Sequence, residues 1–105
     1  MSAPAASCET FTLDFGEGVR VSVCVNFARL VGPSDGWHGD FYTITESGSF
    51  RRKHARRCLP WFAEVFSGVS ARTNKPIVGM LPNPDGPPLL LVCEPNEPPQ
   101  FIALP

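Results

Sequence analysis

The sequence predicts an α+β fold in which a small antiparallel sheet is covered on one face by one helix, in the order β-β-β-α-β-β. Apolar and polar residues alternate between positions 10 and 27, which indicates a hairpin. Apolar residues recur at steps of three and four between 55 and 69, which indicates a helix. At 105 residues, 43% of them hydrophobic, the chain is long enough for one ordinary core. We therefore expect a single domain, residues 1–105.

The first hairpin is predicted by two alternating runs joined by glycines. Gly16-Glu17-Gly18 is the expected turn, because glycine readily adopts the positive φ angles that tight turns require. Every second residue before and after the turn is apolar, so each strand has one face that can be buried. The residues of these faces are Phe11, Leu13, Phe15, Val19, Val21, Val23, Val25 and Phe27.

A third strand and the helix occupy the middle of the chain. Residues 32–36 are typical of a loop, and residues 41–45 have the β-branched and aromatic content of a strand. Ser49 is the predicted N-cap of a helix that extends to residue 69. Pro60 leaves two alternatives, either one kinked helix or two helices with Pro60 at the first position of the second. The apolar stripe expected to pack on the sheet is Ala55, Cys58, Leu59, Phe62, Phe66 and Val69.

Eight of the twelve prolines lie between residues 82 and 105. They separate two apolar runs, 77–81 and 89–92, which we interpret as a hairpin around a proline-rich loop at 82–88. Residues 95–105 are expected to be a C-terminal extension or to add an edge strand at 101–104. An open edge there would permit homodimerisation. Residues 1–6 are expected to be a disordered N-terminus.

Composition and cysteine usage favour a soluble, cytoplasmic protein. The apolar stretches are well short of the roughly 20 residues needed to cross a bilayer, and the first residues lack the pattern of a signal peptide. We therefore expect no membrane partner. The four cysteines, at positions 8, 24, 58 and 93, are widely separated, and no pair has C-x-x-C spacing. We expect them to be reduced.

The positive charge of the chain is concentrated in one segment. Five of the nine lysines and arginines lie within residues 51–57, although the formal net charge is only −1. We call residues 51–57 the basic segment. On a helix, four of its cations spread over roughly 140° opposite the apolar stripe, and Arg51 lies nearer to that stripe. Such clustering indicates an anionic partner or facing carboxylates. The candidate polyanion-binding residues are Arg51, Arg52, Lys53, Arg56 and Arg57.

Two interpretations of the basic segment are open. In the first, its cations bind phosphates while aromatic side chains stack on bases. In the second, it is a solvated helix face balanced by acids such as Glu46 or Glu64. A pI near 6.1 is low for a dedicated nucleic-acid binder, for which a value above about 9 is more usual. The candidate stacking or pocket residues are Trp37, His38, Phe41, Tyr42 and Trp61.

The sequence contains no complete catalytic or metal motif. A Cys58 thiolate with His38 or His54 as base and Asp40 as orienter is formally conceivable, but nothing in the sequence brings these groups together. His54 and Cys58 are four residues apart, a spacing that lets two ligands share a metal, yet a tetrahedral site would need two further ligands from other segments. We therefore expect no enzymatic activity, no catalytic residues, no metal and no cofactor.

These observations predict a small non-enzymatic binding module that binds nucleic acid or another anionic macromolecule through the basic segment. The alternative is a protein-binding adaptor or inhibitor, such as a small viral or mobile-element accessory protein that acts on a host protein. Two P-x-x-P matches, at 84–87 and 95–98, support this alternative only weakly, because neither has an adjacent basic residue. The salt dependence of binding distinguishes the two, since phosphate contacts are salt-sensitive and apolar contacts are not.

Overall fold

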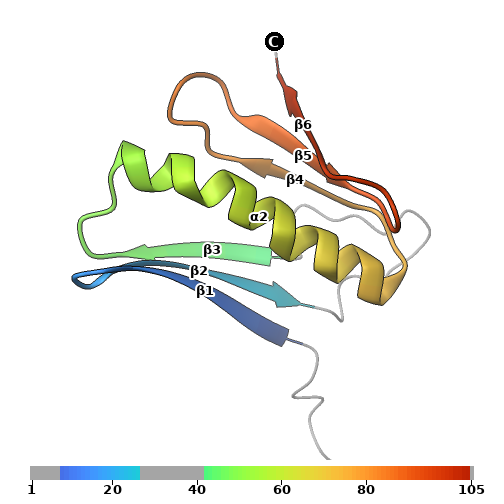
Figure 1. The fold of residues 1–105 in the computed structure, drawn as a ribbon, viewed down its shortest axis with the longest axis horizontal. Coiled ribbons are helices and arrows are strands. Elements are labelled where there is room, and N and C mark those ends of the chain that lie inside the picture. The colour runs from blue at the N-terminus through green and yellow to red at the C-terminus, as the bar shows by residue number, and fades with distance from the viewer. Residues whose placement is uncertain (1–7, 27–41, 105) are drawn as a thin grey trace, which may run out of the picture. The chain divides into compact units, whose positions relative to one another are not determined.

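The computed structural model of this chain describes residues 8–26 and 42–104 (Figure 1). The α+β class is confirmed, and within the described residues every pair of neighbouring strands is antiparallel. The strands form two three-stranded sheets, where we expected one, and the chain divides into two compact units, residues 1–49 and 50–105. The single-domain prediction stays a prediction. The loop expected at 32–36 and the N-terminus expected to be disordered lie outside the described residues.

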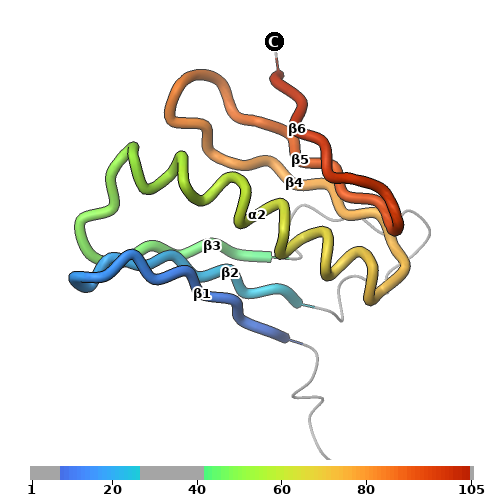
Figure 2. Tube along the Cα trace, in the orientation of Figure 1, coloured from blue at the N-terminus to red at the C-terminus, as the bar shows by residue number. Residues whose placement is uncertain are grey.

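The first unit contains the predicted hairpin and the third strand. β1 (Cys8–Gly16) pairs with β2 (Val19–Asn26), and β2 pairs with β3 (Tyr42–Ser47), so that the sheet order is β1-β2-β3 (Figure 2). Directly paired residues lie on the same face of a sheet. The register therefore places the apolar residues of all three strands on one face.

Burial confirms the alternation predicted for this sheet. Phe11 lies opposite Val23, which in turn lies opposite Ile44. Phe11 and Ile44 are half-buried, whereas the alternate valines of β2 are buried. Phe27, predicted to continue this face, lies outside the described residues. The buried members of the face on β2 are Val19, Val21, Val23 and Val25.

The turn between β1 and β2 has the predicted glycines at positions of positive φ. Gly16, Glu17 and Gly18 have φ angles of 88°, 54° and 77°. The backbone N–H of Gly16 donates to Oδ1 of Asp14 at 2.7 Å, a local side-chain bond of the kind that aspartate makes in turns. The register shifts between Asp14 and Gly16, which is a bulge of one residue at Phe15.

The helix starts and ends later than predicted. α2 (Arg52–Thr73) is one uninterrupted helix, so the chain is not split at Pro60. Its N-cap is Arg51 rather than Ser49. It ends at Asn74, which has φ 55° and ψ 39°, a left-handed conformation that asparagine tolerates better than most residues. The helix therefore extends four residues beyond the predicted end at residue 69.

The apolar stripe of the helix is confirmed. Phe62 and Phe66 are both buried, with their rings stacked at a centroid separation of 6.3 Å. Ala55 and Leu59 are half-buried. The buried residues of the helix are Cys58, Phe62, Ala63, Phe66, Val69 and Ser70.

The second unit also contains the predicted C-terminal hairpin and edge strand. β4 (Ile77–Leu81) and β5 (Leu89–Cys93) are joined by the loop at 82–88, as predicted. β6 (Gln100–Ala103) pairs with β5, one residue earlier than the edge strand expected at 101–104. The sheet order is β4-β5-β6.

Within this unit, α2 packs on one face of the sheet, over β4 and β5. The Ser70 hydroxyl is buried between two backbone carbonyls, 2.7 Å from that of Lys75 and 3.2 Å from that of Cys93. The Ser67 hydroxyl lies 3.7 Å from Sγ of Cys93. These contacts tie the second half of the helix to the end of β5. The buried residues of the sheet face toward α2 are Ile77, Leu81, Leu91 and Cys93.

The four cysteines are free thiols in the structure. Cys58 and Cys93 are buried, Cys24 is half-buried and Cys8 is exposed. Burial raises the pKa of the Cys93 thiol. The hydrogen bond from Ser67 has a smaller effect that lowers this pKa. In the part of the chain that the structure describes, α2 lacks the run of apolar residues that a membrane-spanning helix requires.

Candidate anion-binding segment

The basic segment forms the N-cap and the first turns of α2, and its own residues define where the helix begins. Arg51 is extended (φ −124°, ψ 171°), and its carbonyl accepts the N–H groups of His54 at 2.9 Å and Ala55 at 3.1 Å. The N–H of Arg51 donates to Nδ1 of His54 at 3.0 Å. His54 therefore does what glutamate or glutamine does at this position in a capping box. Because Nδ1 accepts, this bond requires the neutral imidazole with its proton on Nε2.

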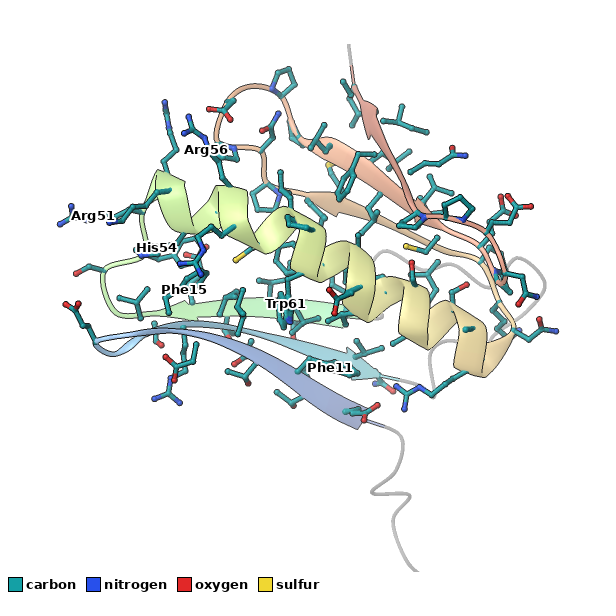
Figure 3. The ribbon with its side chains drawn as sticks, in the orientation of Figure 1. Phe11, Phe15, Arg51, His54, Arg56 and Trp61 are labelled. Carbon is teal, nitrogen blue, oxygen red and sulfur yellow. The ribbon has the colours of Figure 1, made fainter. Side chains whose placement is uncertain are left out.

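All five cations of the basic segment are exposed. Figure 3 shows Arg51, His54 and Arg56 around the first two turns of α2. Arg51 is exposed although its expected position was nearer to the apolar stripe, because it precedes the helix and does not share the geometry of the helix surface. Within residues 8–26 and 42–104, neither Arg52 nor Lys53 has a carboxylate within salt-bridge distance.

The helix dipole does not favour this arrangement. Exposed cations near the positive N-terminal end of a helix each cost about 0.3–1 kcal/mol, and acidic side chains are favourable there. The first turn of α2 holds Arg52 and Lys53 and contains no acidic residue. Arg72 in the last turn lies at the end where a cation is favourable. Because α2 is one helix, the charge of the basic segment does not contribute to helix stability through the dipole.

Asp85 is a carboxylate that the structure places against Arg56 of the basic segment. Nε of Arg56 donates to Oδ2 of Asp85 at 3.0 Å, and Nη2 donates to Oδ1 at 2.6 Å. This is the two-point geometry in which the planar guanidinium matches a carboxylate. The hydrogen bond with Arg56 lowers the pKa of Asp85, and the more distant charge of Arg52 acts in the same direction. Both side chains of the pair are about half exposed, so solvent screens the attraction.

The 82–88 loop holds Asp85 in place through its own hydrogen bonds. Oδ1 of Asn83 accepts the N–H of Asp85 at 3.1 Å, and Nδ2 of Asn83 donates to the carbonyl of Pro87, also at 3.1 Å. Asparagine favours such local turns, and the prolines restrict φ on either side. The sequence predicts balancing acids such as Glu46 or Glu64, whereas the carboxylate that pairs with Arg56 belongs to Asp85. The available signal was an acid in a rigid proline turn.

Of the predicted aromatic partners, the structure places Trp61 on the same helix as the basic segment. Trp37, His38 and Phe41 lie outside them. Tyr42 is half-buried at the start of β3, in the first unit. Trp61 is half-buried on α2, with its ring 5.3 Å from that of Phe62 and tilted by 47°. Trp61 lies on α2, the helix that also carries the cations, one turn beyond Arg57.

Of the residues considered for catalysis, the structure describes Cys58 and His54. Cys58 is buried, and Nδ1 of His54 accepts a backbone N–H. Of the other two residues considered, His38 and Asp40, neither belongs to the described residues. No group of three or more histidine, cysteine, aspartate or glutamate side chains comes close enough to hold a metal ion within residues 8–26 and 42–104.

Comparison of this chain with known protein families, with curated proteins and with solved structures finds no match.

Proposed function

We propose that this chain is a small non-enzymatic binding module that binds nucleic acid or another anionic macromolecule through the basic segment. One observation carries the proposal: five exposed cations lie within seven consecutive positions at the N-cap and start of α2, while Arg52 and Lys53 have no carboxylate partner among the described residues. Charge packed this closely in a chain of net charge −1 raises the local potential well above that of the rest of the surface.

The proposed binding is dominated by phosphate contacts and reads little sequence. Lysine and arginine side chains release condensed counterions when they neutralise phosphates, which gives affinity without base recognition. Trp61 is the proposed stacking residue, because base stacking on an aromatic face tolerates every base. This role requires no catalytic group, and we propose no cofactor. A reducing cytoplasmic compartment is proposed with it, in keeping with four thiols that have no C-x-x-C pairing.

The test is the salt dependence of affinity for a labelled single-stranded oligonucleotide. The variant Arg52→Gln/Lys53→Gln should lower the slope of log affinity against log salt by about 1.4, because each lost phosphate contact removes about 0.7. Glutamine has nearly the helix propensity of arginine and lysine, so the fold should be retained.

The matched control is Arg20→Gln/Arg72→Gln, which removes the same charge from exposed positions outside the basic segment. Its slope should equal that of the wild type. Equal losses in the two variants would mean that net charge, and not this segment, determines binding. Absence of binding by the wild type at about 50 mM salt, where phosphate contacts count most, would refute the proposal.

A second candidate function is supported by a different surface. Three large apolar side chains of the second sheet are exposed, namely Met80, Phe101 and Ile102. Two of them, Met80 and Ile102, lie on the same face of the sheet. Exposed apolar groups that share a face favour a protein-binding adaptor or inhibitor, of the kind that small viral or mobile-element genes encode. Binding of a protein through this sheet would be nearly indifferent to salt, which separates it from the first candidate.

A further inference from the structure

β6 is an open edge strand of unusual composition. Within the described residues it pairs on one side only, with β5, and all four of its residues are exposed. The strand reads Gln-Phe-Ile-Ala and contains no charge. The other described edge strands differ, because β1 and β3 contain acidic residues and β4 has three of its five residues buried. Soluble proteins usually protect an exposed edge with charge.

The exposed apolar residues of β6 lie on both faces of the sheet. Phe101 is opposite Leu91, whose side chain is buried on the face toward α2. Ile102 is opposite Leu90, which in turn is opposite Met80 on the other face. The exposed fractions of Phe101 and Ile102 are nearly equal, at 40% and 43%. A partner lying over one face would cover one of them, whereas a strand beside β6 would contact both.

We propose that β6 pairs with β6 of a second copy of this chain, antiparallel about a two-fold axis, so that two three-stranded sheets become one continuous sheet. A two-fold axis perpendicular to the sheet keeps each face of both copies on the same side. Paired residues must therefore come from the same face. This condition excludes pairing of Phe101 with Ile102 of the second copy. It permits the registers centred on Phe101 or on Ile102, in which that residue pairs with itself.

Charge favours a second copy in this orientation. β6 has no charged residue, so the pairing of two copies along this edge brings no like charges opposite each other. Glu94 and Glu97 lie just before β6 in the chain, and the N–H of Glu97 donates to the carbonyl of Glu94 in the β5–β6 turn. Antiparallel pairing places these acids of the two copies at opposite ends of the joined strands, whereas parallel pairing would place them side by side. Pro98 and Pro99 lack N–H donors, which limits the pairing to β6 itself.

The interface is small, so the dimer should be transient. A stable protein interface buries at least about 1,200 Å² in total, more than a four-residue strand and its neighbours provide. We therefore expect dimerisation that depends on protein concentration. This proposal rests on the edge of the second sheet and is independent of anion binding by the basic segment.

The test is sedimentation of the full chain from about 1 µM to about 1 mM, with three lysine variants. Phe101→Lys places a charge on one face of the β6 edge, and Ile102→Lys places one on the other face. Each variant should raise the dimer dissociation constant at least about tenfold. Met80→Lys is the control, because Met80 is 57% exposed and lies on the same face as Ile102 but on β4. It should change the constant by no more than about twofold.

Two results would overturn the proposal. One is a monomer at every concentration, which is also the result expected if only a different protein occupies this edge. The other is loss of the dimer in Met80→Lys, which would indicate packing through the face of the sheet. Hydrogen exchange of the wild type provides a readout that does not depend on variants folding. The amides of β6 should become more protected as the protein concentration rises, and unchanged protection would again contradict edge pairing.

Discussion

Asp85 changes how the basic segment is understood at the level of single residues. It is 29 residues from Arg56 in the chain, yet the two side chains meet at two points. The pair gives Arg56 an internal carboxylate partner, on a loop whose conformation Asn83 fixes. The structure therefore supports part of the balanced interpretation of the segment, since Arg56 is neutralised while Arg52 and Lys53 have no such partner among the described residues.

The ion pair makes a prediction about pH. Because the folded-state pKa of Asp85 is lowered, its contribution to stability is present above the ordinary aspartate pKa and is lost as pH falls through the lowered value. Arg56→Gln should raise the pKa of Asp85 toward its ordinary value, as followed by NMR titration of the side-chain carboxyl.

Arg52→Gln is the matched control for this titration. Arg52 acts on Asp85 through charge alone and is the weakest of the causes, so its removal should raise the pKa by less than Arg56→Gln does. An unchanged pKa in Arg56→Gln would show that the two-point contact is absent in solution.

The connections between elements depend on glycine backbone geometry at one point in particular. Gly48, which follows β3, has φ 76°, and a Cβ atom there would lie 2.5 Å from the carbonyl oxygen of Gly18. The neighbour is backbone and cannot move as a flexible side chain would. The backbone after β3 therefore lies against the backbone of the β1–β2 turn. Only a residue without a side chain permits this close approach.

Gly48→Ala should destabilise the protein for two separate reasons, the left-handed φ and the clash with Gly18. The first costs about 1–2 kcal/mol for a residue with a Cβ, and the second adds to it. Chemical denaturation measures the sum. Gly16→Ala isolates the first contribution, because Gly16 has φ 88° and open space where its Cβ would be. If Gly48→Ala were no more destabilising than Gly16→Ala, the close approach to Gly18 would not exist in solution.

Gly68→Ala is expected to act in the opposite direction. Gly68 is exposed within α2, and a Cβ atom at this position would have no neighbouring atom within 4 Å. Alanine should therefore stabilise the helix by about 0.5–1 kcal/mol, because it loses less backbone entropy than glycine on folding. The same denaturation experiment measures this gain, and a loss of stability would contradict the open surroundings of Gly68.

For the molecule as a whole, the property to measure is cooperativity between the two compact units. Each unit has a three-stranded sheet, and a chain of 105 residues is expected to form one core. Phe62 reports on cooperativity because it is 3% exposed and stacks on Phe66, within the second unit. Its truncation leaves the sequence of the first unit unchanged.

Phe62→Ala should cost about 3–5 kcal/mol, which is a large part of the stability of so small a protein. Hydrogen exchange reports each unit separately. If the chain is one cooperative domain, amides of β2 should lose protection together with those of α2. If β2 kept its protection while α2 lost it, the two units would fold independently of each other. An unchanged thermal midpoint would contradict the burial of Phe62.

The local structure of this protein follows from its amino-acid sequence. Alternation in β1 and β2, the glycine turn between them and the apolar stripe of α2 each depend on neighbours within a few residues, which is why the pattern predicts them. The helix start was less well predicted, because the N-cap is an arginine and not one of the usual N-cap residues, and His54 accepts its N–H in place of the glutamate or glutamine of a capping box. The composition of the candidate site, five cations within seven residues, is likewise a local property.

Which distant groups meet depends on the folded chain and could not be predicted from local patterns. The six strands of the described residues pair as two sheets. Local patterns do not predict this division, since apolar strands carry little information about which strand lies beside them. The contact of Asp85 with Arg56 depends on where the 82–88 loop lies relative to α2. The exposure of Phe101 and Ile102 on both faces of β6 depends on that strand being last in its sheet, because an apolar residue is buried only where another element covers it.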